Sequence, residues 1–244
     1  MSNSPVLSAE DLAHFEEKGY VRIPEAFPRE EALNMQDAMW AHLHEMYGTV
    51  KEDRSTWNPR TSGMKTEQDA PVYKAIGSER LCGAIDQFLG AGAWQIPRHW
   101  GGFLVTFPPE EPTEWTLPAG GWHWDTHPGL YPGEMVNIRI FLFFSQVKPQ
   151  GGGTLMVEGA HRATKQFVKR LTPRERKLKF RALKKLFEKS NPWLAELGGH
   201  TTRPSGHMAH FMTEPTIVDG VPLRVIEMTG EPGDAILCHP LFWH

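Results

Sequence analysis

The sequence predicts a mainly β domain with a helical N-terminal part. Apolar residues recur at helical spacing in the first third, whereas from Trp94 onward short β-prone runs alternate with Gly and Pro, as in barrels and sandwiches. A chain of 244 residues with 40% hydrophobic composition is also long enough for one large core. We therefore expect a single domain over residues 1–244, with a mainly helical part in 1–92 and a β core in 93–244.

The N-terminal part contains three expected helices and one strand. Ser8 followed by Asp11 is typical of a capped helix start, so we expect a helix over residues 8–18 that stops at Gly19. A strand over 20–23 follows. We expect further helices over 29–47, ended by Gly48, and over 72–89, ended by Gly90, with a polar loop over 51–69 between them.

The β core is expected to consist of runs over 102–107, 136–144, 153–157, 223–228 and 234–238. Between them, an insertion at about 165–200 contains a basic amphipathic segment, which we expect to form one helix over 172–197. A solvated helix whose apolar side packs on the barrel explains this segment best. A lid for an anionic ligand or a partner surface is the alternative.

The charge balance favours a small-molecule partner. The formal net charge of -3 gives no general attraction to nucleic acid or to an anionic membrane. No apolar stretch approaches the length of a membrane span and no secretory signal is visible, while Cys82 and Cys238 stand in no metal-binding spacing. We expect a cytoplasmic protein, and the sequence sets no oligomeric state.

The strongest local motif is His123-Trp124-Asp125. In an extended strand, residues i and i+2 point to the same side, so this imidazole and this carboxylate can bind one metal together. A further histidine from a distant strand would complete the two-His, one-carboxylate facial triad that is diagnostic of iron(II) oxygenases. The motif alone is short, and it leaves open which histidine completes the set.

Three blocks in order resemble the phytanoyl-CoA dioxygenase family. They are the His-x-Asp motif, a Gly-rich turn leading to Glu158-Gly159-Ala160-His161, and Gly233-Asp234 followed by a strand and a distal histidine. Residues 12–24 are also similar to that family's opening helix and strand. The resemblance implies a double-stranded β-helix, or jelly roll, with flanking helices.

The same resemblance implies a ligand set and a reaction. His123, Asp125 and His244 match the iron(II) ligands, with 2-oxoglutarate and O2 as cosubstrates, and His239 is a neighbour rather than a ligand. The expected reaction hydroxylates or otherwise oxidises an unactivated C–H bond of a small organic molecule, releasing succinate and CO2. Asp125 occupies the coordination position that related halogenating enzymes leave open for chloride. His161 is expected to be a loop residue that shapes the site.

The chain departs from the family pattern in one respect. The family anchors the far carboxylate of 2-oxoglutarate with an arginine after the distal histidine, and we expect the working protein to carry a further segment that supplies it. Among the residues present, Arg139 is the substitute candidate, although a surface-facing arginine is the simpler interpretation. Thr106 is a candidate cosubstrate contact, and Phe141 is a candidate member of an aromatic wall that would exclude water.

Two other functions remain open at this point. One is a catalytically inactive jelly-roll protein that binds a metal or a small molecule, and the other is a zinc hydrolase, which uses similar ligands. Fold-level analogy does not choose the substrate, which could be a secondary metabolite or an acyl or CoA-type molecule.

Overall fold

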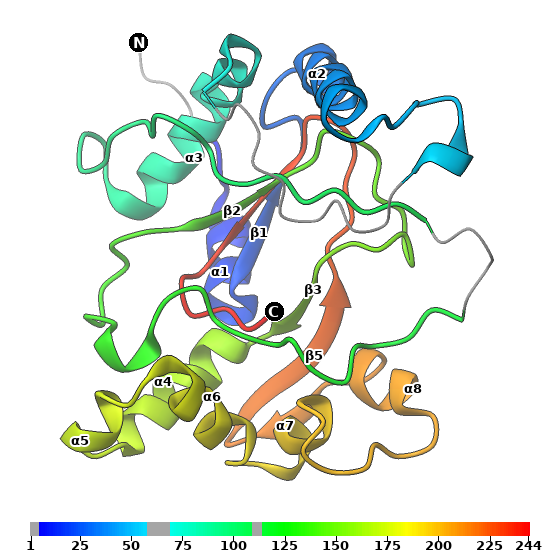
Figure 1. Cartoon of the computed structure of the whole chain (residues 1–244). Helices are drawn as coiled ribbons and strands as arrows, with labels where there is room; N and C mark the ends of the chain where they lie inside the picture. Colours follow the sequence, from blue (N-terminus) through cyan, green and yellow to red (C-terminus); the bar gives the residue numbers. More distant parts are fainter. Residues whose placement is uncertain (1–4, 58–68, 109–113) are drawn as a thin grey trace.

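The computed structural model describes residues 5–57, 69–108 and 114–244. Two small antiparallel sheets lie in the middle of the molecule, with helices α2 and α3 at one end and helices α4 to α8 at the other (Figure 1). The described helices contain more residues than the described strands, so the expectation of a mainly β chain is not met in this part of the chain. None of these helices has both the length and the apolar character that crossing a bilayer requires.

The N-terminal elements follow the sequence prediction closely. Helix α1 (Ala9–Lys18) starts with a capping box between Ser8 and Asp11 and ends at Gly19, whose φ of 88° is in the left-handed region. Strand β1 (Tyr20–Ile23) and helix α2 (Arg29–Tyr47) match their predicted ranges.

The expected helix over 72–89 is wrong as one element. The structure has a 3-10 helix, Pro71–Ile76, and then α3 (Glu79–Leu89), because Ser78 caps a new helix by accepting a hydrogen bond from the N–H of Leu81. A short 3-10 helix, Arg54–Thr56, occupies the start of the predicted loop over 51–69. Residues 58–68 of that loop are outside the described residues.

The first sheet has the order β1-β6-β2. Its central strand, β6 (Ala235–Cys238), is buried along its whole length and pairs antiparallel with β1 on one side and with β2 (Arg139–Leu142) on the other. In this register Tyr20, Cys238 and Arg139 are direct neighbours across the three strands, so their side chains share one face of the sheet.

The second sheet has the order β3-β5-β4 and is formed by β3 (Leu155–Glu158), β5 (Val221–Glu227) and β4 (Thr216–Val218). An apolar cluster joins the two sheets, because Met156 of β3 and Met228, which directly follows β5, pack against Ile236, Cys238 and Phe242. We call these residues, with Phe143, the interior cluster.

The C-terminal helices differ from the prediction. The expected single helix over 172–197 is instead α5 (Pro173–Arg176), α6 (Phe180–Glu188) and α7 (Pro192–Leu197), because Thr172 and Asn191 each cap a new start with a proline in the first turn. Two helices, α4 (Ala160–Arg170) and α8 (His207–Met212), were not predicted. The expected strand over 102–107 is also wrong, because no described strand pairs with these residues.

Candidate metal centre

Burial alternates along the His-x-Asp motif. Trp122 and Trp124 are only 2% and 1% exposed, whereas His123 is partly exposed and Asp125 is exposed. Nε1 of Trp124 donates a hydrogen bond to Oγ1 of Thr164 on α4, at 3.0 Å. Because alternate side chains of an extended chain point to opposite sides, the buried tryptophans turn His123 and Asp125 away from this core.

His244 lies directly opposite His123. The N–H of His123 donates to the carbonyl of His244 at 2.7 Å, and the N–H of His244 donates to the carbonyl of His123 at 3.1 Å. On the other side, the N–H of Val157 in β3 donates to the carbonyl of Trp243 at 2.9 Å. Trp243 and His244 are therefore held between the His-x-Asp motif and the second sheet. The ring centroids of His123 and His244 are 4.2 Å apart.

These contacts bring together the three residues that the sequence nominates as ligands. One possible donor atom from each of His123, Asp125 and His244 lies within 4.8 Å of the other two, and Nε2 of His123 is 3.7 Å from Oδ1 of Asp125. The side chains of His123 and Asp125 are 46% and 38% exposed, so small molecules can reach them. Two imidazole nitrogens and one carboxylate oxygen are the donor set of a facial triad with open coordination positions.

The ring nitrogens of the two histidines fit a metal. Nδ1 of His123 is 2.8 Å from the carbonyl of Gly121 and so carries the proton, which leaves Nε2 as a free electron pair facing Asp125. A ligating histidine usually makes such a bond through its other nitrogen. Nδ1 of His244 is buried and has no hydrogen-bond partner among the described residues. A bound cation would supply a partner for this side chain.

Burial also sets the protonation of the site. Burial lowers the pKa of His244 to about 4, and the neighbouring His123 acts in the same direction. His244 is therefore neutral at pH 7, as a metal ligand must be. The thiol of Cys238 has a pKa well above its ordinary value because it is buried and near Asp125, so it stays protonated.

Arg139 lies beside the carboxylate of the triad. Its Nη2 donates to the carbonyl of Asp125 at 3.2 Å and to Oγ1 of Thr126 at 3.4 Å, and its Nε is 3.8 Å from Oδ2 of Asp125. The side chain is 40% exposed. The guanidinium thus lies beside the candidate metal centre, and its Nη2 is hydrogen-bonded to the protein.

Aromatic rings cover one side of His244. The ring of Phe242 stacks on it at 4.2 Å and 12°, and Phe141 approaches it edge to face at 6.1 Å. Phe141 also packs on Phe242 at 5.8 Å. The predicted aromatic residue Phe141 is therefore part of the wall beside the distal histidine.

Two other residues singled out from the sequence make their described contacts with groups outside the triad. The side chain of Thr106 is exposed beside Gly152, whose Cβ, if present, would lie 3.1 Å from Cγ2 of Thr106. His161 is not a loop residue, because it lies in the first turn of α4, where its Nε2 contacts the carbonyl of Glu16 at 3.1 Å. Its ring packs against the buried His239 at 4.9 Å.

The sequence did not reveal the residues that support the site. The hydrogen bond from Trp124 to Thr164 joins residues 40 positions apart in the sequence, so no local sequence pattern predicts it. Nε2 of His127 contacts the carbonyl of Leu178 at 2.9 Å, which ties the segment after Asp125 to the turn between α5 and α6. Gly121 was visible in the motif, but its carbonyl as the partner of His123 was not.

Comparison with known proteins gives one family. The sequence model of the phytanoyl-CoA dioxygenase family matches residues 15–244, which is nearly the whole chain. No curated protein matches the chain.

Proposed function

The chain belongs to the phytanoyl-CoA dioxygenase family, and from this premise we propose that it is an iron(II)- and 2-oxoglutarate-dependent dioxygenase. Members of this family are dioxygenases of that class. One observation carries the proposal for this chain, namely that His123, Asp125 and His244 present their donor atoms within 4.8 Å of one another. The substrate we propose is a small organic molecule with an unactivated C–H bond, either a secondary metabolite or an acyl or CoA-type compound.

In this proposal the three ligands hold iron(II). Bound there, iron(II) with 2-oxoglutarate and O2 supplies the oxidising power to oxygenate a C–H bond, and 2-oxoglutarate leaves as succinate and CO2. His123 is oriented by its bond to Gly121, and Asp125 contributes the negative charge that favours a divalent cation. Its carboxylate supports an oxygenation outcome, because it fills the position that halogenating relatives leave open.

Arg139 is our candidate for holding the cosubstrate. A guanidinium has five N–H donors, and the hydrogen bonds of Arg139 to the backbone of Asp125 and to Thr126 use only Nη2. The remaining donors can bind a carboxylate of 2-oxoglutarate beside the metal. Phe141 and Phe242 would keep water from the same space, which protects the reaction from side products.

We further propose that the two sheets are parts of one double-stranded β-helix. The interior cluster between the sheets supports this arrangement, because residues of both sheets contribute to it. The triad then lies at one edge of the space between them.

The first test measures iron binding and 2-oxoglutarate-dependent succinate formation, without added substrate, in wild type, His123→Ala and Asp125→Ala. The matched control is His210→Ala, because His210 is also partly exposed but pairs with Glu196 away from the triad. We expect succinate in wild type and control and its loss, by at least about a hundredfold, in both triad variants. Iron binding with no succinate would instead favour a metal-binding protein without catalysis.

A further inference from the structure

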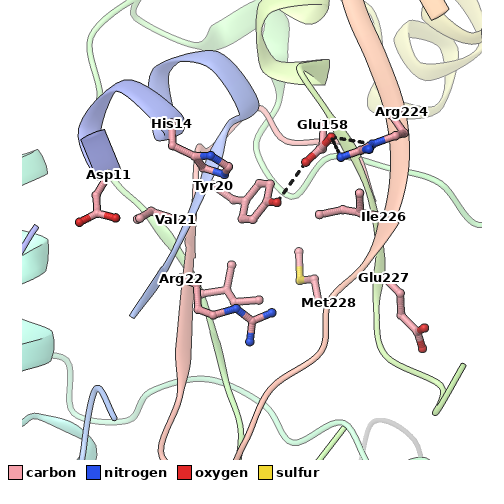
Figure 2. Close-up of a pocket in the computed structure, with 11 residues that line it drawn as sticks. Asp11, His14, Tyr20, Val21, Arg22, Glu158, Arg224, Ile226, Glu227 and Met228 are labelled. Atoms are coloured by element: carbon pink, nitrogen blue, oxygen red, sulfur yellow. Dashed lines mark hydrogen bonds and ion pairs between the residues drawn. The ribbon is translucent and has the colours of Figure 1, made fainter. Parts of the chain in front are cut away.

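A hollow lies at the β1 edge of the first sheet, whereas Arg139 of the candidate metal centre lies on β2 at the other edge. It has a volume of about 430 Å³, within the range of small-molecule sites, and is lined by residues of α1, β1, β3, β5 and β6 and by Met228 after β5 (Figure 2). Tyr20 on β1 and Arg139 on β2 share one face of the sheet, with Cys238 of β6 between them. The hollow therefore lies on the same face as the candidate metal centre but is separated from it by the central strand.

The floor of the hollow is apolar. It is formed by Ile226, Met228 and Ile236, of which Met228 and Ile236 are 2% and 1% exposed and belong to the interior cluster. Ile226 is only partly buried, so a ligand placed here would remove its hydrocarbon from water. The floor therefore suits the apolar part of an organic molecule.

One carboxylate on the rim is fully engaged by the protein. Glu158 is 3% exposed, and its Oε1 accepts a hydrogen bond from the hydroxyl of Tyr20 at 3.0 Å. Its Oε2 accepts from Nε of Arg224 at 3.0 Å and lies 2.8 Å from Nη2 of the same residue. Figure 2 shows this carboxylate turned toward both partners. Glu158 and Arg224 thus neutralise each other.

The other two carboxylates are also occupied. Oδ2 of Asp11 accepts from the N–H of Ser8 at 2.9 Å and from its hydroxyl at 2.8 Å. Glu227 turns away from the hollow (Figure 2) and accepts from the backbone N–H groups of Gln150 and Gly153, at 2.5 and 2.9 Å. The carboxylates that line the hollow therefore all have donors from the protein.

Arg22 differs from these groups because its contacts are long. Its Nη1 is 3.6 Å from Oδ2 of Asp234 and its Nη2 is 3.4 Å from Oγ1 of Thr229, both beyond the usual hydrogen-bond range of about 2.7–3.2 Å. Asp234 is itself satisfied by the N–H groups of Glu25 and Glu231, at 3.1 and 3.0 Å. Arg22 lines the hollow, and the N–H groups of its guanidinium make only these long contacts with the described residues, so they can bind a ligand.

We propose that this hollow is a binding site for a small organic anion with an apolar body. The carboxylate of the ligand binds Arg22, and its hydrocarbon part covers Ile226, Met228 and Ile236. Arg22 supplies the N–H donors that an anion needs, whereas the carboxylates of the lining already accept hydrogen bonds from the protein. The site uses none of the residues of the candidate metal centre, so it stands independently of the proposed function.

The test is a titration of the full chain with pentanoate, followed by methyl NMR of ¹³C-methionine-labelled protein. The reporter is the Met228 methyl signal, assigned with Met228→Leu. Pentanol and pentylammonium serve as neutral and cationic probes of similar size. The variants are Arg22→Gln, Arg22→Lys, and the matched control Arg29→Gln, whose arginine also makes a 3.6 Å ion pair, with Glu231, but does not line the hollow.

We expect pentanoate to shift the Met228 signal saturably and to bind about tenfold or more tightly than pentanol. Arg22→Gln should weaken pentanoate binding about tenfold or more, whereas Arg22→Lys should retain most of it and Arg29→Gln all of it. Equal affinity for pentanol, tighter binding of pentylammonium, or unchanged binding in Arg22→Gln would overturn the proposal. If Arg22→Gln does not fold, the comparison of the three probes on wild type decides.

Discussion

His161 and His239 form a buried pair beneath α1 that should make the folded chain sensitive to acid. They are 2% and 4% exposed, and their rings lie 4.9 Å apart. Nδ1 of His161 is buried with no hydrogen-bond partner among the described residues. Burial lowers the pKa of His161 to about 4 and that of His239 to about 2. Protonation of either ring would place an unpaired charge in the core.

The direction and size of the effect follow from linkage. Because the unfolded chain binds these protons more tightly, the stabilisation is fully present above about pH 6.5 and is lost as the pH falls toward 4. For His161 alone, a fall from pH 7 to pH 5 should reduce the free energy of unfolding by about 2 kcal/mol. His239 acts in the same direction.

The assay is urea unfolding at pH 7 and pH 5, followed by tryptophan fluorescence, for wild type and His161→Gln. Glutamine does not titrate, so the variant should lose about 2 kcal/mol less stability than wild type over this interval. His210→Gln is the control, because it makes the same replacement at a partly exposed histidine and leaves the buried pair of His161 and His239 intact. An equal pH dependence in wild type and His161→Gln would refute the reasoning.

Two further predictions concern the surroundings of the metal centre. Gly129→Ala should reduce the free energy of unfolding by about 1–3 kcal/mol in urea unfolding, because its Cβ would clash with the backbone carbonyl oxygen of Arg176. Gly120→Ala, where a Cβ would meet nothing within 4 Å, should change it little, and equal losses in the two variants would contradict this. Arg139→Gln should weaken 2-oxoglutarate binding about tenfold or more, measured by calorimetry with iron(II) under anaerobic conditions, while iron binding changes by less; unchanged 2-oxoglutarate affinity would remove Arg139 from the site.

Local signals predicted the first N-terminal elements, α1, β1 and α2, well. The capping box of Ser8 and Asp11 and the stop at Gly19 depend only on neighbouring residues, so the start and end of α1 were readable. The same kind of signal was overlooked in the insertion, where Thr172 before Pro173 and Asn191 before Pro192 each start a new helix.

Strand pairing was less readable. Residues 102–107 have β-prone composition, but no described strand offers them a hydrogen-bonding partner, and a strand depends on that partner more than on its own side chains. The helix α4 was missed because its buried face, with Ala163, Thr164 and Phe167, contains a polar residue whose partner is the distant Trp124.

The candidate site was predicted in part from spacing and in part from resemblance. The period of two in an extended chain nominated His123 and Asp125 together, whereas only the family resemblance nominated His244. The reciprocal backbone bonds between His123 and His244 join residues far apart in the chain, and therefore no local pattern encodes them. The same backbone pairing fixes the position of His244, on which the ring of Phe242 stacks.

The measurement that tests the central claim most directly is the visible charge-transfer band of a chelated iron(II)–2-oxoglutarate complex, recorded anaerobically and without substrate. We predict a band in wild type and in His210→Ala, and its loss in His123→Ala and in Asp125→Ala. A band that persists in both triad variants, or wild type that binds iron and 2-oxoglutarate without a band, would contradict the assignment of these residues to the metal centre.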